Sequence, residues 1–208
     1  MTTESRYEYA RDDFNYPRFI QRILQKILNN SIKMIETSDL ERGTLQNMRY
    51  GIMGLSILAL LMNAYFIVGL LVAIWIFMDQ LNLHLYVDRN APASRMRHLI
   101  EEIPLVLGLS LHMWFQGHIW SGVAALLGIT GLYFLTNLQM KYDLMAIQIP
   151  RLYFLRWDRM GIISLFALFG AWPGERSYLW VVLLAWFLAA LTYYDYIWIL
   201  IQLAKKKK

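Results

Sequence analysis

The chain has 208 residues, of which 58% are apolar and 17% are charged. A soluble domain carries roughly 45–50% apolar and about 25% charged residues. Residues 51–78, 103–140 and 177–194 contain no Asp, Glu, Lys or Arg, and uncharged apolar runs of about 18 residues or more are typical of membrane-spanning helices. The composition therefore excludes a soluble enzyme, a nucleic-acid-binding domain and a disordered tail.

The formal net charge of +5 would suit nucleic acid, but the basic residues flank the hydrophobic runs and do not gather on a soluble module. This distribution favours a lipid bilayer with anionic headgroups as the partner and argues against nucleic acid. The chain contains no Cys, which excludes disulfides, thiolate metal sites and cysteine nucleophiles, and we expect no metal site.

A helix is predicted over residues 17–36, because apolar side chains recur there at helical spacing. The opposite face carries Arg18, Arg22, Lys26 and Lys33. We interpret it as a basic amphipathic helix that lies in the headgroup plane and binds the membrane surface through these four residues. Two alternatives stay open: the helix packs on a partner subunit, or it covers the chain's own membrane segments. A polar arm, this helix and a polar connector over 37–50 make residues 1–49 a unit preceding the membrane domain.

Three hydrophobic runs follow within residues 50–204. They are 51–83 with Asn63 near its middle, 103–140 broken at 115–118, and 160–203 broken at 173–176, and charged loops over 84–102 and 141–159 separate them. If each run is a helical hairpin, 19 of the 20 basic residues fall on the side of the termini and only Arg176 falls on the other. Such an asymmetry predicts an all-α polytopic integral membrane protein with about six segments in three hairpins.

Both termini are then cytoplasmic, and residues 205–208 form a basic tail that serves as a charge anchor or as a retrieval signal of the endoplasmic reticulum. The pattern does not distinguish a bacterial inner membrane from an organellar or endoplasmic reticulum membrane. Divided at Asn63, the first run gives arms of only about 12–15 residues, whereas a spanning helix needs about 20. One tilted helix over 51–78 would instead give five spans; the charge count favours the hairpin.

Four acidic residues are candidate functional groups in or near the membrane: Asp79, Glu101, Glu102 and Asp195. A carboxylate inside a membrane segment is costly and by default suggests a functional site. Asp195, Glu101 and Glu102 also have a structural interpretation. Asp195 stands among tyrosines that resemble an aromatic belt. Glu101 and Glu102 stand at the start of a segment, where acidic side chains interact favourably with the helix dipole.

His112 and His118 are the histidines that lie within a hydrophobic run, and they are candidate cofactor-binding residues. Gly108 stands one turn before His112, and a small residue there would let a tetrapyrrole (haem or a chlorophyll-type pigment) approach while the imidazole binds its metal. A hydrogen-bonded or interfacial histidine is the favoured interpretation, and the sequence requires no cofactor.

The sequence thus favours a non-catalytic membrane protein: an accessory or scaffold subunit of a membrane assembly, or a membrane-shaping hairpin protein. Other membrane subunits or a second copy of the chain are the expected partners, and no catalytic residue is predicted. The first alternative is a tetrapyrrole-binding membrane subunit. The second is a lipid-active enzyme or a small transporter that uses the acidic residues.

Overall fold

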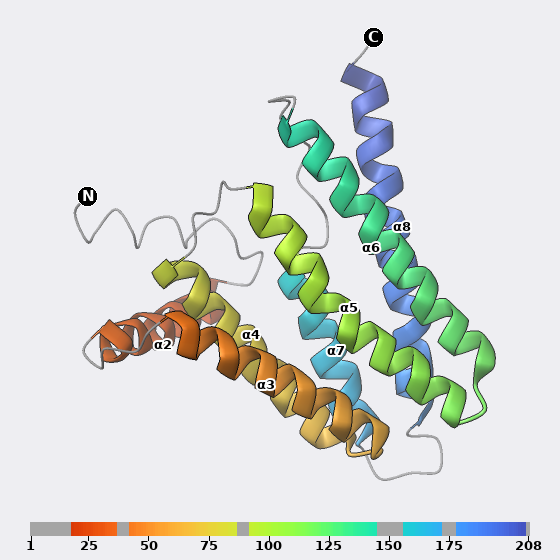
Figure 1. The fold of residues 1–208 in the computed structure, drawn as a ribbon, viewed down its shortest axis with the longest axis horizontal. Helices are drawn as coiled ribbons and strands as arrows, with labels where there is room; N and C mark the ends of the chain where they lie inside the picture. The colour runs from red at the N-terminus through yellow and green to blue at the C-terminus, as the bar shows by residue number, and fades with distance from the viewer. Residues whose placement is uncertain (1–17, 37–41, 87–91, 145–155, 172–177, 207–208) are drawn as a thin grey trace.

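The computed structural model describes residues 18–36, 42–86, 92–144, 156–171 and 178–206, and every regular element in these ranges is an α-helix (Figure 1). The all-α prediction is therefore confirmed for the described part of the chain. The helices are α2 (Arg18–Glu36), α3 (Arg42–Leu61), α4 (Tyr65–Tyr86), α5 (Pro92–Phe115), α6 (Ile119–Leu144), α7 (Arg156–Gly170) and α8 (Tyr178–Lys206).

Helices α3 to α8 pack as a closed ring. Going round it, α3 packs on α4, α4 on α7, α7 on α8, α8 on α6, α6 on α5, and α5 returns to α3. Helices α3 and α4 therefore lie across the ring from α8 and α6 (Figure 1). The main hydrophobic core fills the middle of the ring and includes Val68, Trp75, Leu109, Ile163 and Leu184.

Helices α3 and α5 end in the same backbone capping motif, and each is followed by a tight hairpin turn. Asn63, between α3 and α4, has a φ of 60°, and Gly117, between α5 and α6, has a φ of 80°. The amides of Asn63 and Ala64 donate to the carbonyls of Leu60 and Ala59 at 3.1 and 2.9 Å, which is the Schellman pattern that caps a helix C-terminus. The amides of Gly117 and His118 form the same two hydrogen bonds, to the carbonyls of Trp114 and Met113. The backbone groups of both turns are therefore bonded within the turns.

The predicted break at 115–118 is confirmed, and the chain also turns at Asn63, so a single helix over 51–78 does not form. Asn tolerates a positive φ better than most side chains, because its short amide bonds locally. The turn therefore needs neither Gly nor Pro. The predicted break at 173–176 lies outside the described residues.

Helix boundaries are where the sequence prediction is wrong. Helix α3 begins at Arg42 inside the expected connector, and α5 begins at Pro92 inside the expected charged loop over 84–102. Likewise α6 continues to Leu144 and α7 begins at Arg156, so the loop over 141–159 is shorter than predicted. Lys, Arg and Glu are good helix formers and Pro is favoured in a first turn, so polar flanks extend the helices. The arms α3 and α4 consequently have 20 and 22 residues, not 12–15.

Helix α2 lies against the ends of α3 and α4 that are opposite the turn at Asn63. Its Leu28 and Ile32 are buried in a small second core with Leu45 of α3 and Leu81 of α4. Lys26 and Lys33 are exposed, as are Ile27 and Met34, while the side chains of Arg18 and Arg22 lie outside the described residues. Part of the apolar stripe thus covers the chain's own helices, and contact of α2 with a membrane surface stays a prediction.

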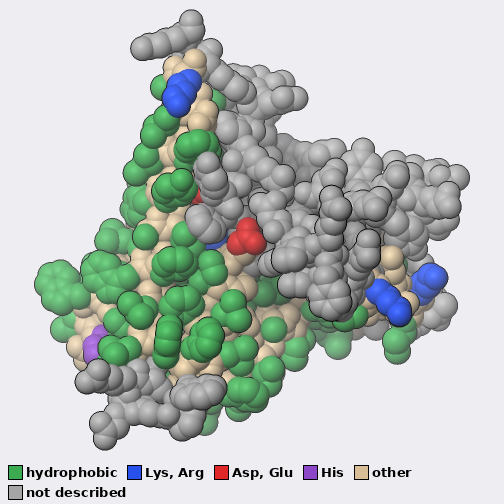
Figure 2. Space-filling model, turned by 180° about the vertical axis from the view of Figure 1, so that it is seen from behind, with side chains coloured by type: hydrophobic (Ala, Val, Ile, Leu, Met, Phe, Trp, Pro, Cys, Tyr) green, Lys and Arg blue, Asp and Glu red, His purple; other side chains and the backbone are tan. Residues whose placement is uncertain are grey.

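Three helices are long and apolar enough to cross a membrane: α4 over Tyr65–Asn82, α6 over Ile119–Leu138 and α8 over Tyr178–Lys205. This supports an integral membrane protein. The other three helices of the ring alternate with them along the chain; α7 has only 15 residues, and α3 and α5 carry charges in their first halves. Figure 2 shows hydrophobic side chains spread over the outer flank, with Lys and Arg near the ends of the molecule.

Candidate functional site: a buried charge layer and a polar tip network

A layer of paired charges lies inside the ring; we call it the charge layer and define it as Arg49, Asp79, Glu101, Glu102 and Arg159. Arg49 of α3 is its centre. One guanidinium nitrogen, Nη2, donates to Oδ1 of Asp79 on α4 and to Oε2 of Glu101 on α5, the latter at 2.7 Å. The exposed fractions of the three residues are 1%, 1% and 4%, so one arginine joins three helices away from solvent.

An aromatic ring supports the same guanidinium. The Cζ atom of Arg49 lies 5.6 Å from the centre of the Trp75 ring, within the range of a cation–π interaction. Trp75 precedes Asp79 by one helical turn, so α4 presents an aromatic face and a carboxylate to the same cation. Two carboxylates and a ring thereby offset the cost of burying the charge.

The second half of the layer joins α5 to α7. Nη2 of Arg159 lies 3.2 Å from each carboxylate oxygen of Glu102, and its Nε lies 3.4 Å from Oε2. Because Glu101 and Glu102 are neighbours, α5 binds Arg49 with one carboxylate and Arg159 with the next. The layer therefore ties α3, α4, α5 and α7 together through side chains that face the interior.

All these groups lie at one level of the bundle. Arg49 and Asp79 are 14 and 16 residues from the turn at Asn63, and Glu101 is 16 residues from the turn at Gly117. At a rise of about 1.5 Å per residue, the three lie about 21–24 Å from the turns. The layer thus closes the ring at the end opposite the two turns.

The structure brings three of the four candidate acidic residues together, Asp79, Glu101 and Glu102. Asp195 is fully buried in α8, whose main neighbour is α6. It is 17 residues from the start of α8, which corresponds to about 25 Å and so to a similar level. Tyr193, two residues earlier, bonds to Thr130 of α6 at 2.7 Å between hydroxyl oxygens.

The partners Arg49 and Arg159 were not among the predicted site residues. Both belong to the basic residues that flank the hydrophobic runs, which the charge pattern places at the membrane surface. A signal was present, however: Arg49 and Asp79 stand at nearly equal distances before and after Asn63, and a hairpin turning there puts them side by side. The side chains of Arg95, Arg97 and His98 lie outside the described residues.

The opposite end of the ring carries the tip network, which we define as Asn63, Tyr65, His112 and Gln116. Oδ1 of Asn63 accepts hydrogen bonds from Gln116 Nε2 at 2.9 Å and from the Tyr65 hydroxyl at 3.1 Å. The Tyr65 oxygen also lies 3.0 Å from Nε2 of His112. Tyr65 therefore lies between Asn63 of the turn and His112 of α5 and contacts both through its hydroxyl oxygen.

These contacts give the tetrapyrrole hypothesis no support, although it stays a prediction. His112 is buried with Nε2 bonded to Tyr65, and a Cβ built on Gly108 would lie 3.0 Å from Ile57, so α3 occupies the space beside that glycine. His118 is half-buried and its ring stacks on Tyr178 with centroids 5.1 Å apart. Both histidines therefore have partners within the bundle.

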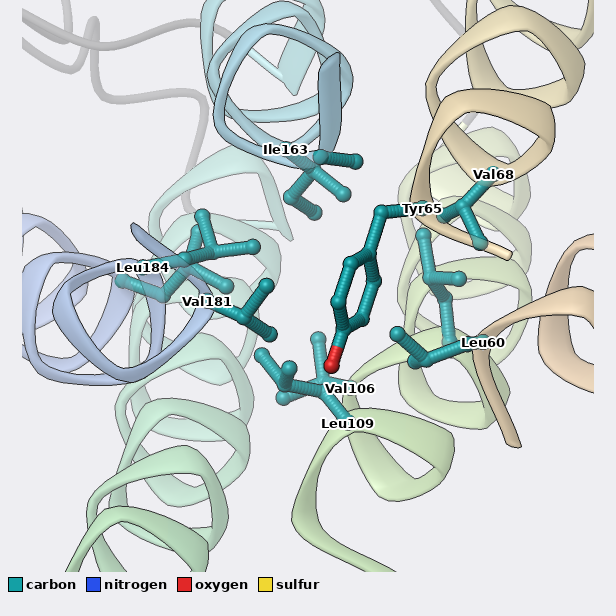
Figure 3. A pocket seen from close by; sticks show the side chains of 11 residues that line it. Leu60, Tyr65, Val68, Val106, Leu109, Ile163, Val181 and Leu184 are labelled. Carbon is teal, nitrogen blue, oxygen red and sulfur yellow. The ribbon is translucent and has the colours of Figure 1, made fainter. Parts of the chain in front are cut away.

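A small cavity lies between the charge layer and the tip network, in the middle of the ring (Figure 3). Figure 3 shows the Tyr65 ring among Leu60, Val106, Leu109 and Val181. The cavity has a volume of about 10 Å³, and its lining is apolar apart from Tyr65. A single water molecule needs about 10–15 Å³. The cavity is a packing defect of the core and has no room for a lipid or a cofactor.

No protein-family model matches the chain, and no curated protein matches it. What can be inferred about function therefore rests on the geometry of the two polar clusters and on the outer surface of the ring.

Proposed function

We propose that the protein is a non-catalytic multi-pass membrane protein that acts as a scaffold or accessory subunit of a membrane assembly, or as a membrane-shaping hairpin protein. The observation that carries this proposal is that the polar side chains of the two clusters bind one another across helices. Arg49 and Arg159 bind carboxylates of neighbouring helices, and Tyr65 links Asn63 to His112. Groups engaged in this way hold the ring together and do not converge on a substrate.

The proposed topology has six segments in three hairpins, with both termini and the charge layer on the cytoplasmic side. It agrees with the distribution of basic residues, of which 19 of 20 then lie on that side. Because the chain lacks Cys, single cysteines at Thr3, Glu175 and Lys207 can report the side directly. The proposal expects an impermeant maleimide to label Glu175→Cys from one side and the other two variants from the opposite side.

The outer surface supports an assembly role. Large apolar side chains are exposed on α3, α6 and α8, as befits contact with lipid or with other membrane subunits; among them are Leu55, Leu58, Phe134, Trp186 and Ile197. Helix α2 adds a surface of different character, with exposed Lys26 and Lys33 beside exposed Ile27 and Met34. We propose that this helix binds anionic lipid headgroups or a partner subunit.

The test compares two truncations after purification in mild detergent. Removal of residues 1–40 deletes α2, whereas removal of residues 1–16 deletes only the preceding arm and serves as the matched control. We expect the longer truncation alone to lose co-purifying subunits, identified by mass spectrometry, or to lose membrane localisation. Identical behaviour of both truncations, or a visible absorption band in the purified full-length chain, contradicts the proposal.

A further inference from the structure

Helix α2 presents three different surfaces around its axis, because successive residues of an α-helix are turned by about 100°. Leu28, Ile32 and Ile35 belong to the surface that packs in the second core with α3 and α4. Ile27 and Met34 stand seven residues apart, on one line of the helix, and 47% and 75% of their surfaces are exposed. The contact with the chain's own helices therefore uses only part of the apolar surface of α2.

The third surface is basic. Lys26 and Lys33 are exposed, also stand seven residues apart, and each directly precedes a member of the exposed apolar pair. A basic line and an apolar line thus run beside each other along the outer side of α2. Figure 2 shows Lys or Arg side chains next to hydrophobic ones at the edge of the molecule where α2 lies. Residues 18–35 contain four basic residues and no Asp or Glu, so α2 is complementary to an anionic surface that also has an apolar layer.

Helix α2 lies at a defined height on the first hairpin. Leu45 of α3 and Leu81 of α4, which pack against it, each stand 18 residues from Asn63 at the turn. At about 1.5 Å per residue, this places α2 about 27 Å from the turn along the helix axes. The hydrocarbon core of a bilayer is about 30 Å thick, so a hairpin that spans it brings α2 to the level where hydrocarbon gives way to headgroups.

An exposed surface of this kind fits lipid better than it fits a protein subunit. An amphipathic helix at a membrane surface buries its apolar residues at the boundary of headgroups and acyl chains, while its basic side chains bind anionic headgroups. The long apolar stem of Lys lies along the acyl region while the ammonium group stays in the polar layer. The cores of protein interfaces are, by contrast, depleted in Lys. Lys26 and Lys33 on the outer side of α2 therefore favour an anionic lipid surface as the partner.

We infer that α2 binds anionic phospholipid while it stays packed on α3 and α4. Lys26 and Lys33 bind the phosphate groups, and Ile27 and Met34 lie in the acyl boundary beside them. The same helix then covers the chain's own helices with one apolar surface and holds lipid with the other. The inference rests on the proposed membrane location, and it names lipid, not a subunit, as the partner of α2 in the proposed function.

The test measures which lipid lies next to α2 in the full chain. A single cysteine at Met34 carries a fluorophore, and the protein is reconstituted into vesicles of two parts phosphatidylcholine and one part phosphatidylglycerol. The composition stays constant, and an acyl-chain nitroxide quencher is carried either by phosphatidylglycerol or by an equal amount of phosphatidylcholine. We expect an apparent affinity several-fold higher for phosphatidylglycerol, and screening by about 1 M salt should remove most of this preference. A fluorophore at Leu58→Cys, exposed on α3, is the control and should show no preference.

Paired substitutions test the two lysines. Lys26→Gln with Lys33→Gln should abolish the preference for phosphatidylglycerol without loss of stability, because both side chains are exposed. Lys141→Gln with Lys205→Gln removes the same charge from exposed positions of α6 and α8 and is the matched control. This control pair should keep the preference at Met34→Cys, since neither lysine belongs to α2.

Three results overturn the inference. Equal quenching by the two nitroxide lipids shows that contact with lipid does not depend on charge. A preference that survives Lys26→Gln with Lys33→Gln assigns it to other residues. Quenching by neither lipid shows that water or a second copy of the chain covers the outer side of α2. Flotation after carbonate extraction checks membrane location: a chain that leaves the vesicles refutes the proposed function itself, whereas a chain that stays and gives any of the three results refutes only the binding of lipid by α2.

Discussion

Arg49 of α3 and Asp79 of α4 form a buried ion pair across the first hairpin, although 30 residues separate them in the sequence. Glu101 of α5 binds the same guanidinium nitrogen at 2.7 Å. A charge desolvated in this way is stable only with its partners in place, so the pair fixes which faces of α3 and α4 meet. Together with the tip network at the opposite end, it joins α3 and α4 to α5.

Replacement of Arg49 by Met should strongly destabilise the fold. Removing one member of a buried ion pair leaves the remaining charge uncompensated and costs about 3–5 kcal/mol. Thermal unfolding in mild detergent, followed by circular dichroism, measures the loss. Lys141→Ala, at an exposed basic position of α6, is the matched control and should change stability by less than about 0.5 kcal/mol.

The triple variant Arg49→Met, Asp79→Leu, Glu101→Leu separates a structural layer from a functional one. An apolar replacement of a whole buried ion cluster is often neutral or stabilising, so we expect most of the stability lost in Arg49→Met to return. If the layer only holds the ring together, the triple variant also keeps its partners and its membrane location. A stable triple variant that has lost its association would assign the layer a direct functional role.

Replacement of Arg159 by Lys should lower the free energy of unfolding, but by less than replacement by Met does. The guanidinium of Arg159 reaches both carboxylate oxygens of Glu102 from one nitrogen and approaches with a second, whereas an ammonium offers one compact charge. Hydrogen bonds to charged groups contribute about 1.5–3 kcal/mol, so a loss of about 1–2 kcal/mol is expected for Arg159→Lys. A wild-type unfolding temperature for Arg159→Lys would show that the geometry of the pair is irrelevant.

Part of this fold could be predicted because its signals are local. Uncharged runs and the excess of basic residues on one side indicate paired membrane helices without any knowledge of packing. The turn at Gly117 follows from a glycine that suits a positive φ. The turn at Asn63 is less evident, since Asn is also common inside helices, and only the charge count favoured it.

The charge layer was harder to predict because pairing depends on rotation about each helix axis. The sequence pattern indicates Asp79, Glu101 and Glu102 as candidate functional groups, but it places Arg49 and Arg159 at the membrane surface, where most flanking cations lie. Helix ends were missed because Lys, Arg and Glu in the polar flanks are good helix formers, so the helices continue beyond the uncharged runs. The cover that α2 provides for α4 likewise depends on tertiary packing, so the sequence left that alternative open.

Gly131→Ala should separate α6 from α8. A Cβ at Gly131 would lie 2.5 Å from Oγ1 and 2.9 Å from Cβ of Thr192, and contacts this short force the helices apart. Overpacking of a tight interior costs about 1–3 kcal/mol. Gly161→Ala in α7 is the control: nothing lies within 4 Å of its Cβ, and the gain in helix propensity should stabilise it by about 0.5–1 kcal/mol. If Gly131→Ala unfolds at the wild-type temperature, the close approach of α6 and α8 is wrong.

Asn63→Ala should weaken the first hairpin, because it removes a hydrogen-bond acceptor and places Ala at a positive φ. A comparison with Asn63→Gly separates the two effects. Both variants lose the acceptor for Gln116 and Tyr65, but only Ala adds the cost of a positive φ, about 1–2 kcal/mol. We therefore expect the order of unfolding temperatures to be wild type, then Gly, then Ala. Gln116→Ala removes one of the two hydrogen bonds without touching the backbone and should lie close to the Gly variant. A higher stability of Asn63→Ala than of Asn63→Gly would mean that the chain continues as one helix through this position.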